Sequence, residues 1–202
     1  MAIESGQAIG CADLQAAGGV RHILIREWKA GDLITVDNAA STVTRIKDSG
    51  GTDADWGVFE SKIETSALTI SGTNEGKAVN TYELNLSFNL PRLNNDKIKR
   101  LQDFQQAECL MVIVVDSNSD AAYSENFVMG ISDKFKNVYD YKRNQTYARI
   151  ASIEGGTGAA FSDETGLTVT ITCTQYQLPL SYVEAAGAGI TILAGGLTAT
   201  TT

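Results

Sequence analysis

The sequence is poor in the residues that most often perform chemistry. It has a single histidine, His22, and three cysteines among 202 residues. A zinc site needs several such ligands, and the chain has no C-x-x-C pair and no second histidine. No G-x-S-x-G motif or Cys–His signature accompanies His22, which falls within a predicted strand. We therefore interpret His22 as structural and predict a protein that is not an enzyme and has no cofactor or metal.

Positive charge and long apolar runs are also scarce. The net charge is −8, from 16 basic and 24 acidic residues, which argues against a surface that grips nucleic acid. No stretch reaches the roughly 18 to 20 apolar residues of a membrane-spanning helix. Residues 1–5 carry neither basic nor apolar clusters, so we expect no signal peptide. The three widely spaced cysteines (Cys11, Cys109 and Cys173) are predicted to be free thiols in a reducing cytoplasm.

Two segments alternate strictly between apolar and polar residues, at 82–90 and at 167–174. Successive side chains of a strand point to opposite faces, so each segment predicts a strand with one core face and one polar face. The polar positions carry threonine, serine and asparagine instead of lysine, which favours a face that is covered or lines something wet. These positions are Glu83, Asn85, Ser87, Asn89, Thr168, Thr170, Thr172 and Thr174.

The remaining patterns predict a mainly β protein, with sandwich- or barrel-forming sheets and one flanking amphipathic helix. The helix is expected at about 96–108, where apolar residues recur at helical spacing after Asn94 and neighbouring cap residues. The apolar run 110–115 predicts a strand covered on both faces. Further strands are expected at 20–28, 63–71 (ended by Gly72), 126–132 and 147–154, with another beginning at 33–36.

The chain divides into an N-terminal arm at 1–19, a β domain at 20–183 and an Ala/Gly/Thr-rich arm at 184–202. The polar stretch 37–61 predicts a long functional or mobile loop, within which 42–47 could pair as a hairpin arm. Trp56 is expected to be exposed there until the loop docks on a partner.

Two groups of charged residues allow more than one interpretation. The loop acids Asp53 and Asp55 are interpreted as solvated charge, with a cation site as the alternative. The segment 134–147 interleaves basic and aromatic residues, which is typical of nucleotide stacking or of a basic rim that meets an acidic neighbour. We favour the basic rim because the whole chain is acidic. Its members are Lys134, Lys136, Lys142 and Arg143.

The second half of the chain also has a characteristic succession of parts over roughly 100 residues. An alternating strand precedes the helix, a buried strand, two further strands, a polar turn, a second alternating strand and a closing run with proline. In order, these are 82–90, 97–106, a strand ending at Asp116, strands near Asn126 and Tyr147, the turn 162–166, 167–174 and 177–183. This succession resembles that of bacteriophage tail tube proteins.

The resemblance implies a β-sandwich subunit that forms homohexameric rings, which stack into a tube in the virion tail after synthesis in the bacterial cytoplasm. Sheets of six subunits would close into one barrel around a lumen through which DNA passes without specific binding. The partners would be copies of the same chain and other tail proteins. By position, the loop 37–61 would clasp the next ring, through Asp48, Asp53, Asp55 and Trp56. The eight alternating polar residues would line the lumen or form subunit contacts.

Three other functions remain open at this point. A decoration, neck or other tail component would also be a virion structural protein, but would form closed trimers or a ring that never stacks. A carbohydrate-binding β-sandwich would use Trp28, Trp56 and the loop acids around calcium. A hydrolase would need a carboxylate pair in one cleft, from Asp53, Asp55 or Asp163.

Overall fold

The computed structural model describes thirteen segments of the chain. These are residues 19–29, 32–37, 41–47, 56–61, 65–74, 80–91, 94–107, 109–116, 126–131, 147–157, 165–183, 191–193 and 196–198. Within them the protein is mainly β, with one sheet of seven strands, one of four strands and a single α-helix. A separate two-stranded hairpin completes the described strands. The predicted fold class is confirmed.

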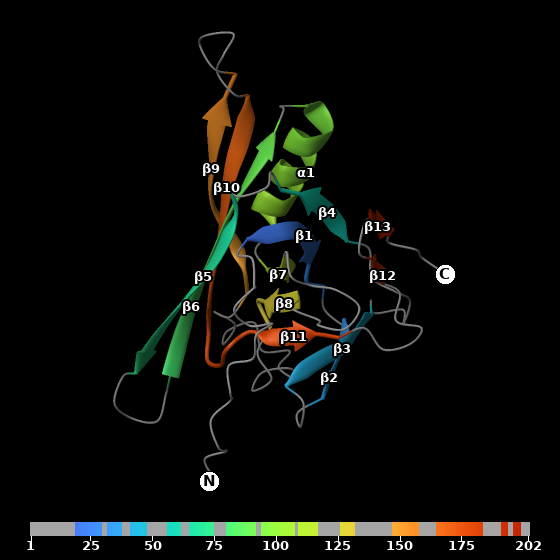
Figure 1. The fold of residues 1–202 in the computed structure, drawn as a ribbon, viewed down its shortest axis with the longest axis vertical. Helices are drawn as coiled ribbons and strands as arrows, with labels where there is room; N and C mark the ends of the chain where they lie inside the picture. The colour runs from blue at the N-terminus through green and yellow to red at the C-terminus, as the bar shows by residue number, and fades with distance from the viewer. Residues whose placement is uncertain are drawn as a thin grey trace, which may run out of the picture.

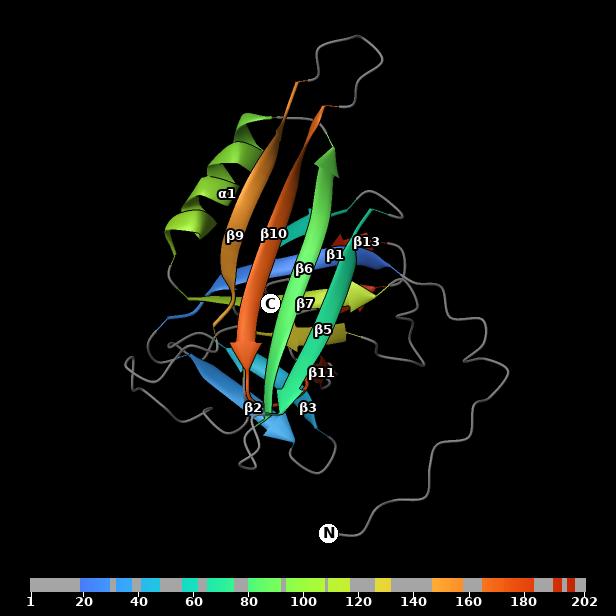
Figure 2. The ribbon, with the colours of Figure 1, turned by 90° about the vertical axis from the view of Figure 1, so that its left-hand side faces the viewer.

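The four-stranded sheet is fully antiparallel and forms one wall of the molecule (Figure 2). Its strand order is β5-β6-β10-β9, so the two alternating segments of the sequence, β6 and β10, lie at its centre. The strands are β5 (Ala67–Asn74), β6 (Asn80–Pro91), β9 (Arg149–Gly156) and β10 (Gly166–Gln175).

The seven-stranded sheet has the order β2-β3-β11-β8-β7-β1-β4. Its pairs are antiparallel except for β11 and β3, which run parallel over a short stretch. The strands are β1 (Val20–Glu27), β2 (Leu33–Asp37), β3 (Thr42–Lys47), β4 (Gly57–Glu60), β7 (Leu110–Asp116), β8 (Asn126–Met129) and β11 (Leu180–Tyr182).

The two sheets pack face to face, with β1 and β7 running crosswise to the long strands β6 and β10 (Figures 1 and 2). Such orthogonal packing is one of the two standard ways in which sheets form a sandwich. The core between the sheets contains Leu84, Leu86 and Phe88 from β6, and Val169 and Ile171 from β10. Each of these side chains is essentially inaccessible to solvent, so the inward face of the two central strands is used for folding.

The seven-stranded sheet has a second core on its other face. Leu24, Met111, Ile113 and Val128 are completely buried there, and all seven strands contribute side chains to the same cluster. Strand β7 is therefore buried on both faces, as its continuous apolar run predicted. Trp56 belongs to this second core and is only 8% exposed.

Helix α1 (Asn95–Gln106) confirms the predicted helix within the usual uncertainty of element ends. The Asn94 side chain caps it by accepting a hydrogen bond of 2.8 Å from the Lys97 backbone N–H. Leu101 is buried, and the Phe104 ring packs edge-on against Phe59 of β4. The helix thereby closes one end of the core between the sheets (Figure 1).

Several predicted boundaries were wrong. The strand predicted at 63–71 is β5, which begins at Ala67 and continues through Gly72, because the long strand β6 pairs with it as far as Asn74. The stretch 37–61 is not one loop: 42–47 is β3, as suggested, but 57–60 is β4 and belongs to the seven-stranded sheet. Strand β11 and the hairpin of β12 (Thr191–Leu193) and β13 (Gly196–Thr198) had not been predicted.

Candidate functional site

The outward face of the four-stranded sheet brings together all eight polar residues singled out in the two alternating segments. In β6 and β10, Asn89 lies opposite Thr168, and Ser87 lies opposite Thr170. Asn85 opposes Thr172, and Glu83 opposes Thr174 in the same register. Directly opposed residues of an antiparallel pair lie on the same face, so the two polar rows are adjacent. The two rows lie over 70 residues apart in sequence, and the pairing of β6 with β10 makes them neighbours.

The flanking strands extend this polar face on both sides. In β5, Thr69 lies opposite Asn85 and Ser71 lies opposite Glu83. In β9, Ser152 lies opposite Thr170 and Glu154 lies opposite Thr168. The alternation of Thr69, Ser71 and Thr73 was visible in the sequence, although the prediction did not single these residues out.

The polar face is rich in hydroxyl groups and carries little charge. Glu83, Asn85, Thr168 and Thr174 are exposed, while Ser87, Asn89, Thr170 and Thr172 are partly buried. Glu83 and Glu154 supply negative charge, and Arg149 of β9, which lies opposite Thr172, supplies a positive one. The face can therefore form many weak hydrogen bonds with water or with a partner, but it offers no cluster of groups suited to acid–base chemistry.

Both edges of this sheet are open within the described part of the chain. Strands β5 and β9 each pair with one neighbour only. The edge strand β5 also exposes Ile70, of which 42% is accessible to solvent. Unpaired strand edges favour pairing with another chain.

The other predicted site residues do not add to this surface. Trp56 was expected to be exposed, and this is wrong: the second core of the subunit buries it, so it needs no partner to shield it. Trp28 is half-buried and its ring lies 5.8 Å from that of Tyr147, so it does not form an open platform for a sugar. The predicted inter-ring residues Asp48, Asp53 and Asp55, and the basic rim Lys134, Lys136, Lys142 and Arg143, lie outside the described residues.

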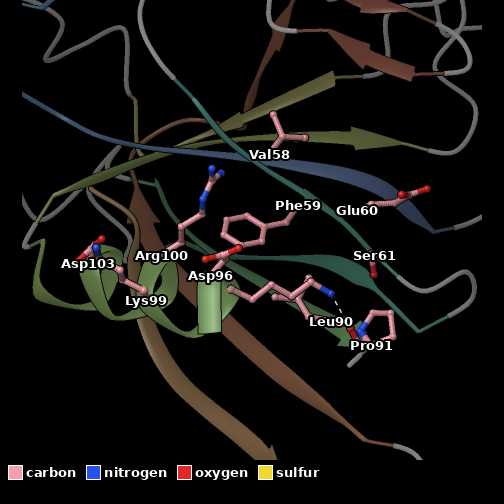
Figure 3. Close-up of a pocket in the computed structure, with 11 residues that line it drawn as sticks. Val58, Phe59, Glu60, Ser61, Leu90, Pro91, Asp96, Lys99, Arg100 and Asp103 are labelled. Carbon is pink, nitrogen blue, oxygen red and sulfur yellow. Dashed lines mark hydrogen bonds between the residues drawn. The ribbon is translucent and has the colours of Figure 1, made fainter. Parts of the chain in front are cut away.

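A second surface feature is a groove of about 830 Å³ between α1 and β4, the edge strand of the seven-stranded sheet (Figure 3). Residues 58–61 of the chain line one side of it, and Leu90 and Pro91 line its end. The helix contributes charged side chains, from Asp96, Lys97, Lys99, Arg100 and Asp103. The Lys97 side chain is held in place by a hydrogen bond of 2.6 Å, which its Nζ donates to the Pro91 carbonyl. Sequence patterns did not indicate this groove, since it depends on how the helix packs against the sheet.

His22 has a structural environment in β1, opposite Glu60 of β4. Burial lowers the pKa of His22 below its usual 6.5; the nearby charge of Arg21 lowers it further, while Glu60 opposes the shift. Burial raises the pKa of the Cys173 thiol to about 11, so this cysteine stays protonated at neutral pH. Among the described residues, no group of three or more His, Cys, Asp or Glu side chains could hold a metal ion. The single helix described, α1, is not long and apolar enough to cross a membrane.

Neither the protein-family models nor the curated proteins contain a match to this sequence. The surfaces of the molecule itself, above all the polar face of the four-stranded sheet, therefore give the best indication of its function.

Proposed function

We propose that this protein is a structural subunit of a phage tail tube, in which hexameric rings stack around a lumen that conducts DNA. The observation that supports the proposal best is the four-stranded sheet, with one face in the core, one hydroxyl-rich face uncovered and both edges open in the described chain. In the assembled virion, this polar face lines the lumen.

The open edges provide the means of assembly. If β5 of one subunit pairs with β9 of the next, the backbone groups of both edges are satisfied and a closed barrel leaves no edge exposed. Six copies of a four-stranded sheet make a 24-stranded barrel. With strands about 4.8 Å apart and tilted by about 40°, its backbone radius is about 24 Å, which leaves room for a DNA duplex inside short side chains.

The chemistry of the polar face suits a lining past which DNA must move. Threonine, serine and asparagine hold a water layer but supply no array of positive charges that would bind phosphates. The net charge of −8 adds a general repulsion between the protein and the DNA backbone. Such a lining lets DNA slide without specific contacts.

Electron microscopy of the purified protein at increasing concentration tests the proposal. Six-fold rings that stack into hollow tubes are the expected result. Closed trimers, or rings that never stack, would instead favour a decoration or neck protein. A chain that stays monomeric under all conditions would rule out both structural functions.

A labelling experiment tests whether the polar face lines the lumen. Thr172→Cys is introduced after Cys11 and Cys109 are replaced by serine, while the buried Cys173 stays unreactive. In unassembled subunits, small and bulky maleimides should both react at position 172. In tubes, the small reagent should still react but the bulky one should not, because it can enter only at the tube ends. Equal reaction of the bulky reagent before and after assembly would place this face outside the lumen.

A further inference from the structure

Among the described strands, the edge strand β4 has backbone groups that pair with no neighbour and lie beside the groove next to α1. Strand β4 pairs with β1 and with no other described strand. The Ser61 backbone N–H donates to the Arg21 carbonyl at 3.3 Å, and Ser61 is in register with Arg21. Hydrogen-bonded pairs alternate along an antiparallel ladder, so Phe59 and Gly57 also bond to β1. The N–H and C=O groups of Val58 and Glu60 therefore point away from β1.

The groove follows this edge and does not lie over one face of the sheet. Consecutive residues of a strand point to opposite faces, yet all of 58–61 line the groove. Helix α1 closes one end, because it packs so tightly on Gly57 that an added Cβ would lie 2.8 Å from the Phe104 ring. Figure 3 shows the side chains of α1 across the groove from those of β4.

The groove is balanced in charge. Its lining includes three basic side chains of the helix (Lys97, Lys99 and Arg100) and three acidic ones, of which Asp96 and Asp103 belong to the helix and Glu60 to β4. A strongly charged peptide would gain little there, since attraction and repulsion would nearly cancel. An uncharged, β-forming segment that supplies backbone hydrogen bonds matches this groove better.

The chain itself contains such a segment at its C-terminal end. Strands β12 and β13 pair with each other but join neither of the two larger sheets. A two-stranded hairpin is at best marginally stable in water, so it needs a further strand or surface. The sequence from Ala185 to Thr202 has no charged residue. The two strands of this hairpin have three residues each, one fewer than the four of β4.

We propose that the β12–β13 hairpin of one subunit adds to the β4 edge of a neighbouring subunit, in the groove beside α1. The inference rests on the self-assembly proposed above and names one of its contacts. Such a contact joins two different surfaces of the same chain, so it propagates from copy to copy as rings and stacked rings require. A contact between two β4 edges would instead produce closed dimers.

A proline substitution tests the backbone pairing. Glu60→Pro removes one outward N–H, and the β1–β4 ladder is preserved because that N–H takes no part in it. Glu60→Ala is the matched control, since it removes the same exposed side chain but keeps the N–H. We expect Glu60→Pro, but not Glu60→Ala, to weaken assembly as much as deletion of residues 185–202 does. Equal behaviour of the two variants, with unchanged melting temperatures, would contradict the proposal.

Hydrogen exchange at the Val58 amide identifies the occupant. In the assembled full-length protein this amide should exchange roughly tenfold more slowly, or slower still, than in a chain ending at Glu184. Mixing isotope-labelled truncated chain with unlabelled Glu60→Pro should restore the protection, because the second chain supplies a tail while its own edge is blocked. Protection that persists in dilute full-length monomers would show that each tail occupies its own subunit, and would overturn the proposal.

These results separate this inference from the proposed function. If the full-length protein forms rings and tubes but truncation leaves Val58 exchange unchanged, the hairpin contact is wrong and the tube subunit stands. If no rings form yet Val58 protection rises with protein concentration and requires residues 185–202, the contact stands and the tube function fails.

Discussion

The two large sheets of this protein differ in how much of their surface is buried. The seven-stranded sheet is buried on both faces at β7, where all residues from Leu110 to Val115 are inaccessible. The four-stranded sheet alternates, so that Leu84 and Leu86 are buried while Asn85 between them is exposed. The first sheet therefore provides stability within the subunit. The second provides half of a core, and its other face is polar and lies outside both cores of the described residues.

The two sheets also differ in whether they contain buried charged side chains. At the end of β1, Arg26 and Asp32 form an ion pair at 2.9 Å with almost no solvent exposure. Asp32 also accepts a hydrogen bond of 2.9 Å from the Lys29 backbone N–H, which links Asp32, just before β2, to the residues that follow β1. The Arg26 Nη1 atom is buried without a hydrogen-bond partner among the described residues. The seven-stranded sheet thus carries a buried ion pair, whereas Glu83 and Glu154 of the other sheet are exposed.

The largest expected effect comes from breaking this ion pair. Asp32→Ala leaves the Arg26 guanidinium buried and uncompensated, which should lower the free energy of unfolding by about 3–5 kcal/mol. Denaturant unfolding of dilute, unassembled chain measures it. The control is Glu27→Ala, at an exposed acid on the same strand, which should change stability by less than about 0.5 kcal/mol. Similar values for both variants would show that the pair does not stabilise the sheet.

A pair of isoleucine substitutions compares the two sheets directly. Ile113 in β7 is completely buried, whereas Ile70 in β5 is 42% exposed. Ile113→Ala should cost about 2–5 kcal/mol, because it removes buried methyl groups and leaves a cavity. Ile70→Ala should cost about 1 kcal/mol or less in the isolated subunit. If Ile70 lies at a subunit contact, its substitution should weaken assembly more than folding, as ring formation by the folded variant would show.

The smallest expected effect is a pH dependence from His22. Its pKa is lowered in the folded protein, so between that pKa and 6.5 the unfolded chain binds more protons. Stability should therefore be fully present above pH 6.5 and decrease as the pH falls through this window. Unfolding curves between pH 7.5 and 5.5 measure the decrease, and His22→Gln should flatten it. An unchanged slope in that variant would assign the dependence to other groups.

The local patterns of the sequence predicted the strongest elements well, for identifiable physical reasons. Strict alternation in β6 and β10 predicted both strands and the residues on each face, because the side-chain period of a strand is two. The continuous apolar run of β7 predicted burial on both sides, and Asn94 with Leu101 and Phe104 predicted the helix. Short strands were harder. Strand β4 lies in a Gly- and Asp-rich stretch, and β11 has only three residues, so neither has a clear apolar pattern. Their conformation is decided by pairing, of β4 with β1 and of β11 with β8.

Trp56 shows why the burial of a side chain is difficult to predict from the polarity of its neighbours in sequence. These neighbours are acidic and glycine-rich, which suggested exposure. Trp56 directly precedes β4, however, and its indole lies in the second core. For the polar face of the four-stranded sheet, the sequence predicted the polar row of each strand but not that the two rows are adjacent. Each strand specified its own polar row, and the sequence contains no local signal that Thr172 would lie opposite Asn85.

By itself, the sequence determined which side of each long strand is polar, where the helix lies and how few histidines and cysteines the chain contains. These properties follow from the order of residues within a few neighbours of one another, since strand and helix periods are local. Only the tertiary structure decided that the polar rows share one face, that Trp56 is buried, and that the β4 edge opens onto a groove beside α1. These properties arise when segments far apart in the chain pack together, because burial and register are set by the partner strand as much as by the strand itself.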